Sequence, residues 1–489
     1  MSRIRELLSD SVIYGLSGVV ARFINYLLVP FYTKFFNPAE YGVIGLIYAA
    51  IVFLNVIYTF GMESSYIRYA ADRGRSDDVF KTVQLSLLGI GTGLCGLLWL
   101  AAPVIMPLMS LYGGGGNLFF MMLVIIWLDA LGIVPYAELR LVRKAVSYAS
   151  IRLVNVAINV GLNLYLVIGL GWGLEAILIS NIIASLFSTG VLFVITLPKY
   201  KGVWSYDLLK TALLFGLPYV PNGIGFAINE VLDRFFLNAM SVADITRIYG
   251  AGYSPEDITG IYNACYKLAI FMLIVVQMFK LAWQPFFMRH ATADDAPLVF
   301  RDVFRYFNYV AAVVVLTVGL FAHEIVRINV PLLDATIIDS RYWMGLSIVP
   351  WLLLAYWFQG WFVNLSAGIF IREKTIELPG ITIAGSVVTV LLNLLLVPKL
   401  GMTGSALATL ACYASMCAIL YVRSRRVFPV SYQWGRAFAM MAVSLGPVLY
   451  GTYWPVNDFS IHIKLLLFLT GGAALTVLCF VQFRYFSKA

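Results

Sequence analysis

Five ionisable side chains lie inside two long apolar segments in the middle of the chain, at residues 211–238 and 261–287. They are Glu230, Asp233, Arg234, Lys267 and Lys280. A charged group inside the hydrocarbon of a bilayer is costly, so it usually faces a water-filled cavity, a partner charge or a substrate. Prolines and glycines at 218–225 predict a bend in the first segment, which would suit a gating element. We therefore interpret these segments as the wall of a site that recognises charge.

The carboxylates near this wall have alternative partners. Glu230 and Arg234 are four residues apart, so they share a helix face and could neutralise each other. Asp233 lies off that axis, which leaves it free to meet Lys267 of the next segment. Asp129, at mid-depth of another apolar segment, is a third candidate for ion coupling or charge pairing.

The intramembrane cations are confined to few segments. Arg22 lies ten residues into the first one, about 15 Å deep in a core roughly 30 Å thick. It could line a cavity or bind backbone carbonyls or Asp129, and Asn25 extends the same polar face. The lysines lie near enough to an interface to serve as anchors instead. All these cations, however, belong to the first, seventh and eighth segments, which favours a substrate-binding cavity. Its predicted lining is Arg22, Asn25, Arg234, Lys267 and Lys280.

Composition indicates a membrane protein. Of 489 residues, 61% are hydrophobic and 12% are charged, compared with about 25% charged in a soluble domain. A net charge of +9 would suit nucleic acid, but no basic soluble module carries it, so we expect no nucleic-acid partner. The five cysteines lie in apolar segments without a CxxC pair or a His cluster, and no catalytic or phosphate-loop motif occurs. We therefore expect no enzyme, no cofactor and no metal site.

The apolar segments define the predicted topology. Cutting the sequence at charge, Gly and Pro clusters gives about 14 segments of membrane-spanning length, so the predicted fold is all-α and polytopic. The loops and termini on one predicted side of the membrane carry 24 Lys and Arg residues, and the loops on the other side carry 6. Four more lie within spans. Positive residues are retained on the cytoplasmic side, so both termini are expected in the cytoplasm, with the protein in the inner or plasma membrane.

The chain also repeats itself. Residues 163–176 match residues 393–406 at a constant shift of 230, sharing Asn, Leu, Val, Gly and Ala at equal positions. The match joins the fifth and sixth segments in one copy and the eleventh and twelfth in the other. A displacement of six spans preserves orientation, so the repeats are parallel and related by an axis along the membrane normal. This predicts two six-helix lobes, residues 1–200 and 201–426, with two additional helices in residues 427–489.

Several short motifs then occur in a specific order. They are LVPFYTK at 28–34, NPAEYG at 37–42, Asp233 with Arg234, GIYNACYKL at 260–268, and the repeat. Together they resemble the polysaccharide-export and oligosaccharide-flippase family, O-antigen flippases included, of the superfamily that holds MATE drug exporters and the lipid II flippase. The resemblance implies alternating access between two lobes, with the first, second, seventh and eighth spans lining a central cavity. One departure is an extra segment at 249–255, before the eighth span.

The resemblance implies a substrate that the cationic cavity also suits. This is a polyprenyl-diphosphate-linked oligosaccharide, moved across the membrane for cell-surface polysaccharide or lipopolysaccharide synthesis. Membrane lipids and other polysaccharide-assembly proteins are further expected partners. A cation-coupled multidrug exporter of the same fold is an alternative, supported by Glu230 and Asp233 but not by Arg22. A membrane glycosyltransferase or polymerase is another, although the large carboxylate-bearing loops usual in such enzymes are missing from the sequence.

The charge count makes a testable prediction about topology. Reporter fusions after Ala489 and within residues 113–116 should lie on opposite sides of the membrane, with the C-terminal reporter in the cytoplasm. A pair of reporters, one active only in the cytoplasm and one only outside it, measures this directly. An external signal from the C-terminal fusion would contradict the predicted topology.

Overall fold

The computed structural model describes residues 20, 24, 28–71, 75–112, 115–291, 293–331, 333–453 and 460–481. Arg22 and Asn25 lie outside these residues, as does most of the first predicted span. The described chain divides into two compact units, and each is described by itself. The first contains Phe35–Ala239, Pro255–Thr259 and the residues before Val29. The second contains Val29–Lys34, Met240–Ser254 and the residues from Gly260 onward.

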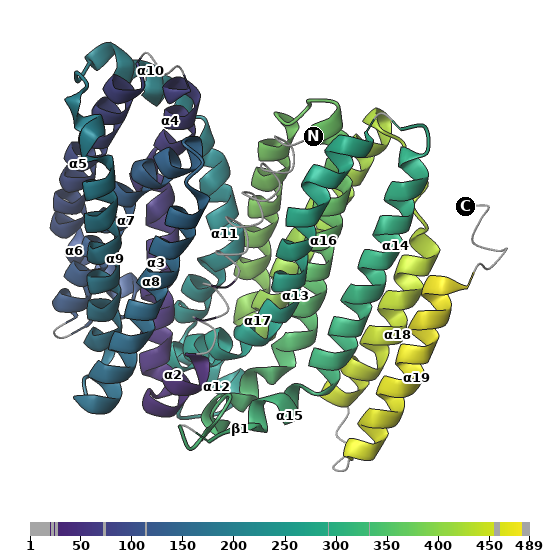
Figure 1. Cartoon of the computed structure of the whole chain (residues 1–489). Coiled ribbons are helices and arrows are strands. Elements are labelled where there is room, and N and C mark those ends of the chain that lie inside the picture. The colour runs from purple at the N-terminus through teal and green to yellow at the C-terminus, as the bar shows by residue number, and fades with distance from the viewer. Residues whose placement is uncertain are drawn as a thin grey trace. The chain divides into compact units, whose positions relative to one another are not determined.

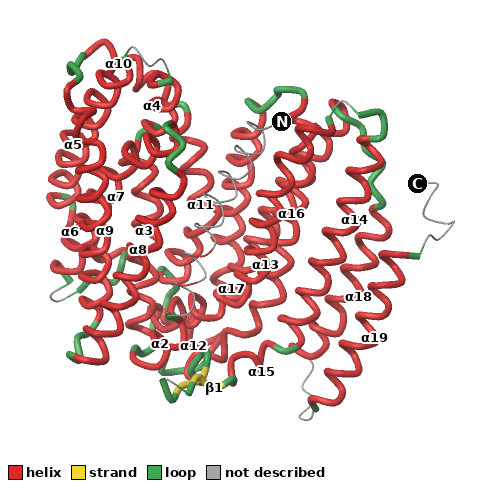
Figure 2. Tube along the Cα trace, in the orientation of Figure 1, coloured by secondary structure: helices red, strands yellow, loops and turns green. Residues whose placement is uncertain are grey.

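Helices make up most of the described chain, and the one strand pair is β1 (Asn329–Val330) with β2 (Ala335–Thr336) (Figure 2). Within the described ranges, ten helices are long and apolar enough to cross a membrane, or eleven with the bent pair α10 and α11. One of them, α17 (Glu377–Val427), joins two helices across a break at Gly401. A helix satisfies its own backbone polar groups, as lipid requires. The chain is thus an all-α integral membrane protein, and the exact count of fourteen spans is not confirmed.

In the first unit, α7 packs against α3, α5 and α9, and α8 packs against α9 (Figure 1). Its elements are α3 (Pro38–Thr59), α4 (Met62–Ala70), α5 (Ser76–Leu100), α6 (Ala102–Leu108), α7 (Gly116–Leu141), α8 (Ala145–Leu164), the π-helix η1 (Tyr165–Gly169), α9 (Leu174–Thr196), the 3₁₀ helix η2 (Leu197–Lys201), α10 (Tyr206–Gly216) and α11 (Tyr219–Asn238). Within this unit α10 packs on α4 and α5, and α11 packs along α3, while the predicted lobe boundary after residue 200 stays a prediction.

In the second unit, α16 packs along α17, and α14 packs against α16, α18 and α19. Its interior holds a buried Asn308, whose Oδ1 accepts hydrogen bonds from Nε1 of Trp357 and of Trp361 at 2.8 and 2.7 Å. Its elements are α2 (Val29–Phe35, whose last residue lies in the first unit), α12 (Val242–Tyr249), α13 (Pro255–His290, whose first turn lies in the first unit), α14 (Ala296–Val314), the π-helix η3 (Val315–Gly319), α15 (Ala322–Arg327), β1, β2, the 3₁₀ helix η4 (Ser340–Ile348), α16 (Val349–Ile371), α17, α18 (Trp434–Tyr453) and α19 (Ile461–Phe480).

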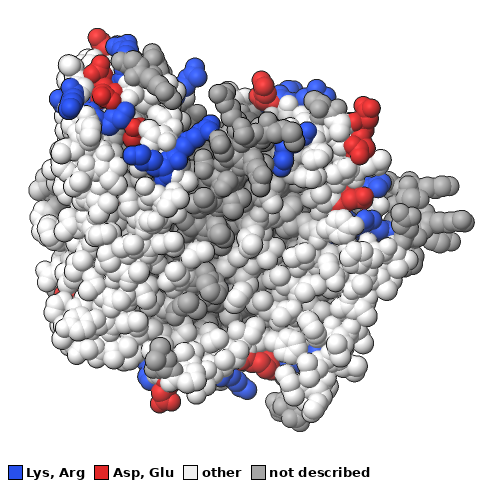
Figure 3. Space-filling view, in the orientation of Figure 1, with Lys and Arg blue, Asp and Glu red and all other residues white. Residues whose placement is uncertain are grey.

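The outer surfaces of the helices are apolar. In Figure 3 the visible flanks carry few charged atoms, and Lys, Arg, Asp and Glu atoms gather toward the ends of helices. Large apolar side chains such as Leu100 on α5 and Leu469 on α19 are 79% and 65% exposed. An apolar surface of this kind matches the hydrocarbon of a bilayer. The structure therefore supports the membrane assignment made from composition.

The sequence repeat has a structural counterpart. Gly171 and Gly401 occupy equal positions in the two copies, and both adopt a left-handed backbone, with φ of 68° and 57°. Asn163 and Asn393 are both fully buried, and each donates from Nδ2 to the backbone oxygen four residues earlier at 2.8 Å. Glycine adopts positive φ without steric cost, so it ends one helix and starts the next at both places. Both copies thus place a glycine of positive φ at the same position of the repeat.

The extra segment at 249–255 begins at the end of α12, which packs on α17 and ends at Tyr249. The hydroxyl of Tyr249 accepts a hydrogen bond from the backbone N–H of Met402 at 2.6 Å, directly beside the break at Gly401. Arg247 Nη2 donates to the backbone oxygen of Pro398 at 2.6 Å on the other side of the break. Burial raises the pKa of Tyr249 to about 12, so the phenol stays neutral at physiological pH. α12 therefore fixes the turn between the eleventh and twelfth spans.

The two equivalent glycines allow a matched comparison. A Cβ at Gly401 would lie 1.9 Å from the Tyr249 oxygen, whereas one at Gly171 would meet nothing within 4 Å. Gly171→Ala should cost only the backbone strain of about 1–2 kcal/mol, and Gly401→Ala should cost about 1–3 kcal/mol more from overpacking. Thermal unfolding of the purified proteins measures the difference. Adding Tyr249→Ala should bring the Gly401→Ala cost close to that of Gly171→Ala, and equal costs without it would contradict this account.

Candidate functional site

The charged residues of the seventh span lie on α11. Arg234 Nη1 donates to Asp233 Oδ1 at 2.8 Å and to the backbone oxygen of Glu230 at 2.6 Å. Asp233 and Arg234 are only 3% and 6% exposed. Asp233 thus pairs with its neighbour in sequence, and its meeting with Lys267 stays a prediction. Pairing lowers the cost of holding both charges inside the membrane.

The two lysines of the eighth span lie on α13, in the second unit. Lys267 is partly buried and Lys280 is exposed. Thirteen residues separate them, which corresponds to about 20 Å along the helix axis and about 220° around it. They therefore occupy different faces of α13. Arg22 and Asn25 remain predictions from the sequence, because both lie outside the described residues.

A polar cluster surrounds Asp129 inside the first unit. Ser185 Oγ of α9 donates to Asp129 Oδ1 of α7 at 2.9 Å, and the side chain of Asn55 on α3 is a second hydrogen-bonding partner of the carboxylate. Asn181 Nδ2 of α9 donates to the hydroxyl of Tyr48 on α3 at 3.2 Å. Three neighbouring helices therefore contribute oxygen-rich side chains to one place, which is chemically able to hold a proton or a monovalent cation.

Sequence reasoning identified Asp129 alone in this cluster. The sequence does contain a pattern that indicates the other residues of the cluster. Tyr48 and Asn55 are seven residues apart, and Asn181 and Ser185 are four apart, so each pair lies on one helix face. Among the described residues, no group of three or more His, Cys, Asp or Glu side chains could hold a metal ion.

The bend predicted in the seventh span is present and touches a second break. α10 and α11 are bent by 45°, and α3 and α4 part at Phe60 and Gly61, with φ of 47° and 66°. A Cβ on Gly61 would lie 2.2 Å from the backbone oxygen of Gly216, and one on Gly216 would lie 2.5 Å from the backbone oxygen of Phe60. Ser65 Oγ donates to the backbone oxygen of Ala212 at 2.7 Å across the same contact. The breaks of the second and seventh spans are thus in direct backbone contact.

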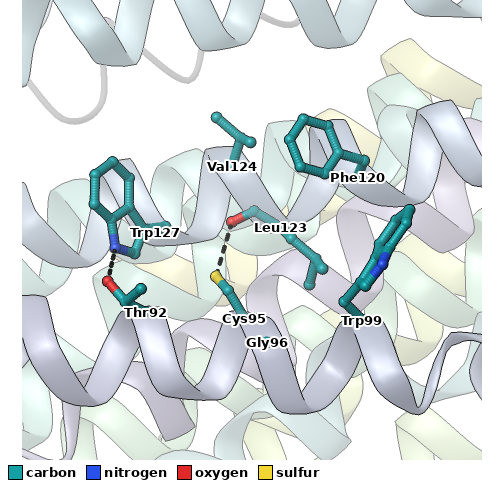
Figure 4. A pocket seen from close by; sticks show the side chains of 8 residues that line it. All are labelled: Thr92, Cys95, Gly96, Trp99, Phe120, Leu123, Val124 and Trp127. Carbon is teal, nitrogen blue, oxygen red and sulfur yellow. Dashed lines mark hydrogen bonds between the residues drawn. The ribbon is translucent and has the colours of Figure 1, made fainter.

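The first unit also carries an apolar pocket of about 590 Å³ between α5 and α7 (Figure 4). Trp127 Nε1 donates to Thr92 Oγ1 at 3.1 Å across it, and Trp99 and Phe120 form the other end. None of its lining residues is charged. It therefore does not fit an anionic head group.

Comparisons with known proteins agree with this architecture. The sequence profile of a family described as "Polysaccharide biosynthesis protein" matches residues 32–329. A structure of the lipid II flippase MurJ in an inward closed conformation has a TM-score of 0.73 at 14% identity, covering 96% of this chain and 98% of that one. An inward-facing structure of a multidrug resistance MATE family transporter has a TM-score of 0.64 at 17% sequence identity, and the match covers 89% of this chain and 96% of that one. A MOP superfamily transporter from Pyrococcus furiosus has a TM-score of 0.58 at 14% sequence identity, and the match covers 89% of this chain and 96% of that one. A search of curated proteins found no match. At these identities the structural likenesses establish the fold.

The contact between the two breaks makes a prediction about stability. Gly216→Ala should destabilise the protein by about 1–3 kcal/mol, because the added methyl overlaps the backbone of Phe60. Gly93→Ala on α5, where a Cβ would meet nothing within 4 Å, is the matched control and should be neutral or stabilising. Thermal unfolding in detergent compares the two. Equal midpoints for both variants would show that the spans are not in tight contact.

Proposed function

The chain belongs to the family of polysaccharide biosynthesis proteins, whose profile covers more than half of its length, and from this premise we propose that it is a flippase. Its substrate in this proposal is a lipid-linked oligosaccharide, a polyprenyl diphosphate that carries sugars, moved across the cell membrane by alternating access. The likeness to a lipid II flippase in fold supports the mode of transport. Other proteins of polysaccharide assembly would supply and consume this substrate.

One observation carries the substrate class: cationic side chains lie within apolar membrane-spanning segments. Arg234 is buried on α11, and Lys267 and Lys280 lie on α13. Guanidinium and ammonium groups form strong charge-assisted hydrogen bonds with phosphate oxygens. A neutral drug-like substrate gives no reason for this set of charges.

The polar cluster around Asp129 favours a second candidate, a cation-coupled exporter of small molecules. In that case the carboxylate would take up a proton or a monovalent cation as the substrate leaves. The same cluster could instead couple a flippase to an ion gradient, so substrate charge is what separates the two functions. A membrane glycosyltransferase or polymerase receives the least support, because the fold is one of transporters and flippases.

We expect Arg234→Gln to abolish surface glycan export and Arg234→Lys to retain part of it, since lysine keeps the charge but loses the planar fork that holds two oxygens. Lys280→Arg should likewise be tolerated better than Lys280→Met. Export is measured as lipid-linked glycan reaching the outer face, at matched protein levels.

The buried ion pair requires a control. Arg234→Gln alone removes one partner of the buried Asp233–Arg234 pair, and such a change costs about 3–5 kcal/mol of stability. The double variant Asp233→Asn with Arg234→Gln removes both charges and should recover stability without recovering export. The decisive test adds Lys267→Met and Lys280→Met to the stable double variant. Normal glycan export by this combined variant would exclude the proposed phosphate recognition.

A further inference from the structure

A short piece of the first span is held by the second unit. Residues Val29–Lys34, which form α2 up to its last residue, belong to that unit, although the chain on both sides of them belongs to the first. Figure 1 shows α2 and β1 at the same end of the second unit. Lys34 and Arg341 at this end belong to the smaller set of loop cations, which is predicted to lie outside the cell. The outer end of the first span thus finds its contacts in a different unit from its neighbours in sequence.

Arg341 caps the end of α2. Its Nη2 donates to the backbone oxygens of Thr33 and Lys34 at 2.9 and 3.0 Å. The last carbonyls of a helix have no partner within the helix, and a cationic side chain can satisfy them. The carboxylate of Asp339 holds the guanidinium in place, with Oδ1 at 2.9 Å from Nε. The backbone N–H of Asp339 also donates to Thr33 Oγ1 at 3.3 Å, so segments far apart in sequence are joined here.

Lys34 makes the reciprocal contact. Its Nζ donates to the backbone oxygen of Leu333 and, at 3.0 Å, to that of Asp334, in the turn between β1 and β2. A lysine of α2 therefore binds the hairpin, while an arginine that follows the hairpin binds α2. Arg341 and Asp334 are exposed, and water can replace a hydrogen bond at the surface at little net cost. The contact is therefore specific and also reversible.

The turn after α2 leaves little slack. Only Phe36 and Asn37 separate α2 from α3, which lies in the first unit. The start of α3 is fixed by a capping box, in which Asn37 and Glu40 exchange hydrogen bonds between side chain and backbone N–H, each at 2.9 Å. From Phe35 to Pro38 even an extended chain spans at most about 11 Å. Any separation of the two units at this end beyond that reach would pull α2 away from the hairpin.

We propose that this contact is an outer latch, which keeps the end of the first span on the second unit and must open before the two units can move apart at this end. The latch consists of Thr33, Lys34, Leu333, Asp334, Asp339 and Arg341. The inference rests on the alternating access of the proposed function. Arg341 is its main positioning residue, because one guanidinium binds two carbonyls of α2 and the Asp339 carboxylate.

Thiol labelling of Thr33→Cys measures the latch without any transport assay. Cys95, the least buried of the five native cysteines, is first replaced by serine. Thr33 is fully buried, so a cysteine there should react slowly with a maleimide in the purified protein. Arg341→Gln should speed this reaction about tenfold, because it removes charged hydrogen bonds to α2. Arg327→Gln is the matched control, since Arg327 lies over the Trp343 ring at 4.9 Å, and it should leave the rate unchanged.

Equal labelling rates with and without Arg341 would overturn the latch. Should Arg341→Gln fail to fold, Arg341→Lys decides instead. Lysine keeps the charge but lacks the planar fork that serves several acceptors at once, so it should speed labelling to a smaller extent. An unchanged rate in the lysine variant would count against the latch in the same way.

A reversible cross-link tests whether the latch must open. Lys34→Cys with Asp334→Cys, joined by a short cleavable thiol cross-linker, keeps α2 on the hairpin. Glycan export should stop while the cross-link is present and return after its reduction. The same cross-linker between Arg327→Cys and Trp343→Cys, both within the second unit, should leave export unchanged.

The two proposals fail in different ways. Full export by the cross-linked latch would show that the latch stays closed during transport, which would overturn its proposed role. Export that is absent from the unmodified protein as well would count against the flippase proposal, and the labelling rates of Thr33→Cys would still decide whether Arg341 holds α2.

Discussion

A polar group inside a bilayer finds no water, so the chain itself must satisfy it, and this requirement shapes both units. Helices close the backbone hydrogen bonds locally. Several polar side chains that remain inside are paired with one another, as Asn308 is with Trp357 and Trp361, and as Asn393 is with Ser405 at 3.0 Å. A buried polar group without a partner costs more than the net gain from a hydrogen bond, so each such pair fixes the rotation of its helices.

The same requirement explains why the helices break where they do. A break frees backbone groups, and it is tolerated in a membrane protein only where neighbouring protein covers it. The break at Gly61 lies against the backbone of Gly216, and the break at Gly401 lies against Tyr249. Both contacts are too close for a Cβ. Two breaks that share one contact cannot move independently, so straightening of the bent seventh span would displace the break of the second.

Much of the fold was predictable from hydrophobicity, because spans read as long apolar runs and the left-handed Gly171 and Gly401 mark equal positions of a repeat. The break at Phe60 was not, since a positive φ at a non-glycine residue is imposed by packing and leaves no local signal. The packing of α11 along α3 was not predictable either, because it is a tertiary preference. For the candidate site, residue types could be predicted but partners could not, and Arg234 binds its own neighbour, Asp233.

That neighbouring pair places a condition on how an anionic substrate could be carried. A bare guanidinium in a low-dielectric interior is costly, so a site that binds phosphate needs an internal anion when the substrate is absent. Asp233 is suited to that part, because it is adjacent in sequence and reaches Arg234 through its own side chain. An incoming phosphate would then exchange one partner for another, and the net cost of binding would be the difference between two ion pairs. Such an exchange lets the substrate leave as readily as it binds. A transporter needs this reversibility, because a substrate that binds too tightly is not released.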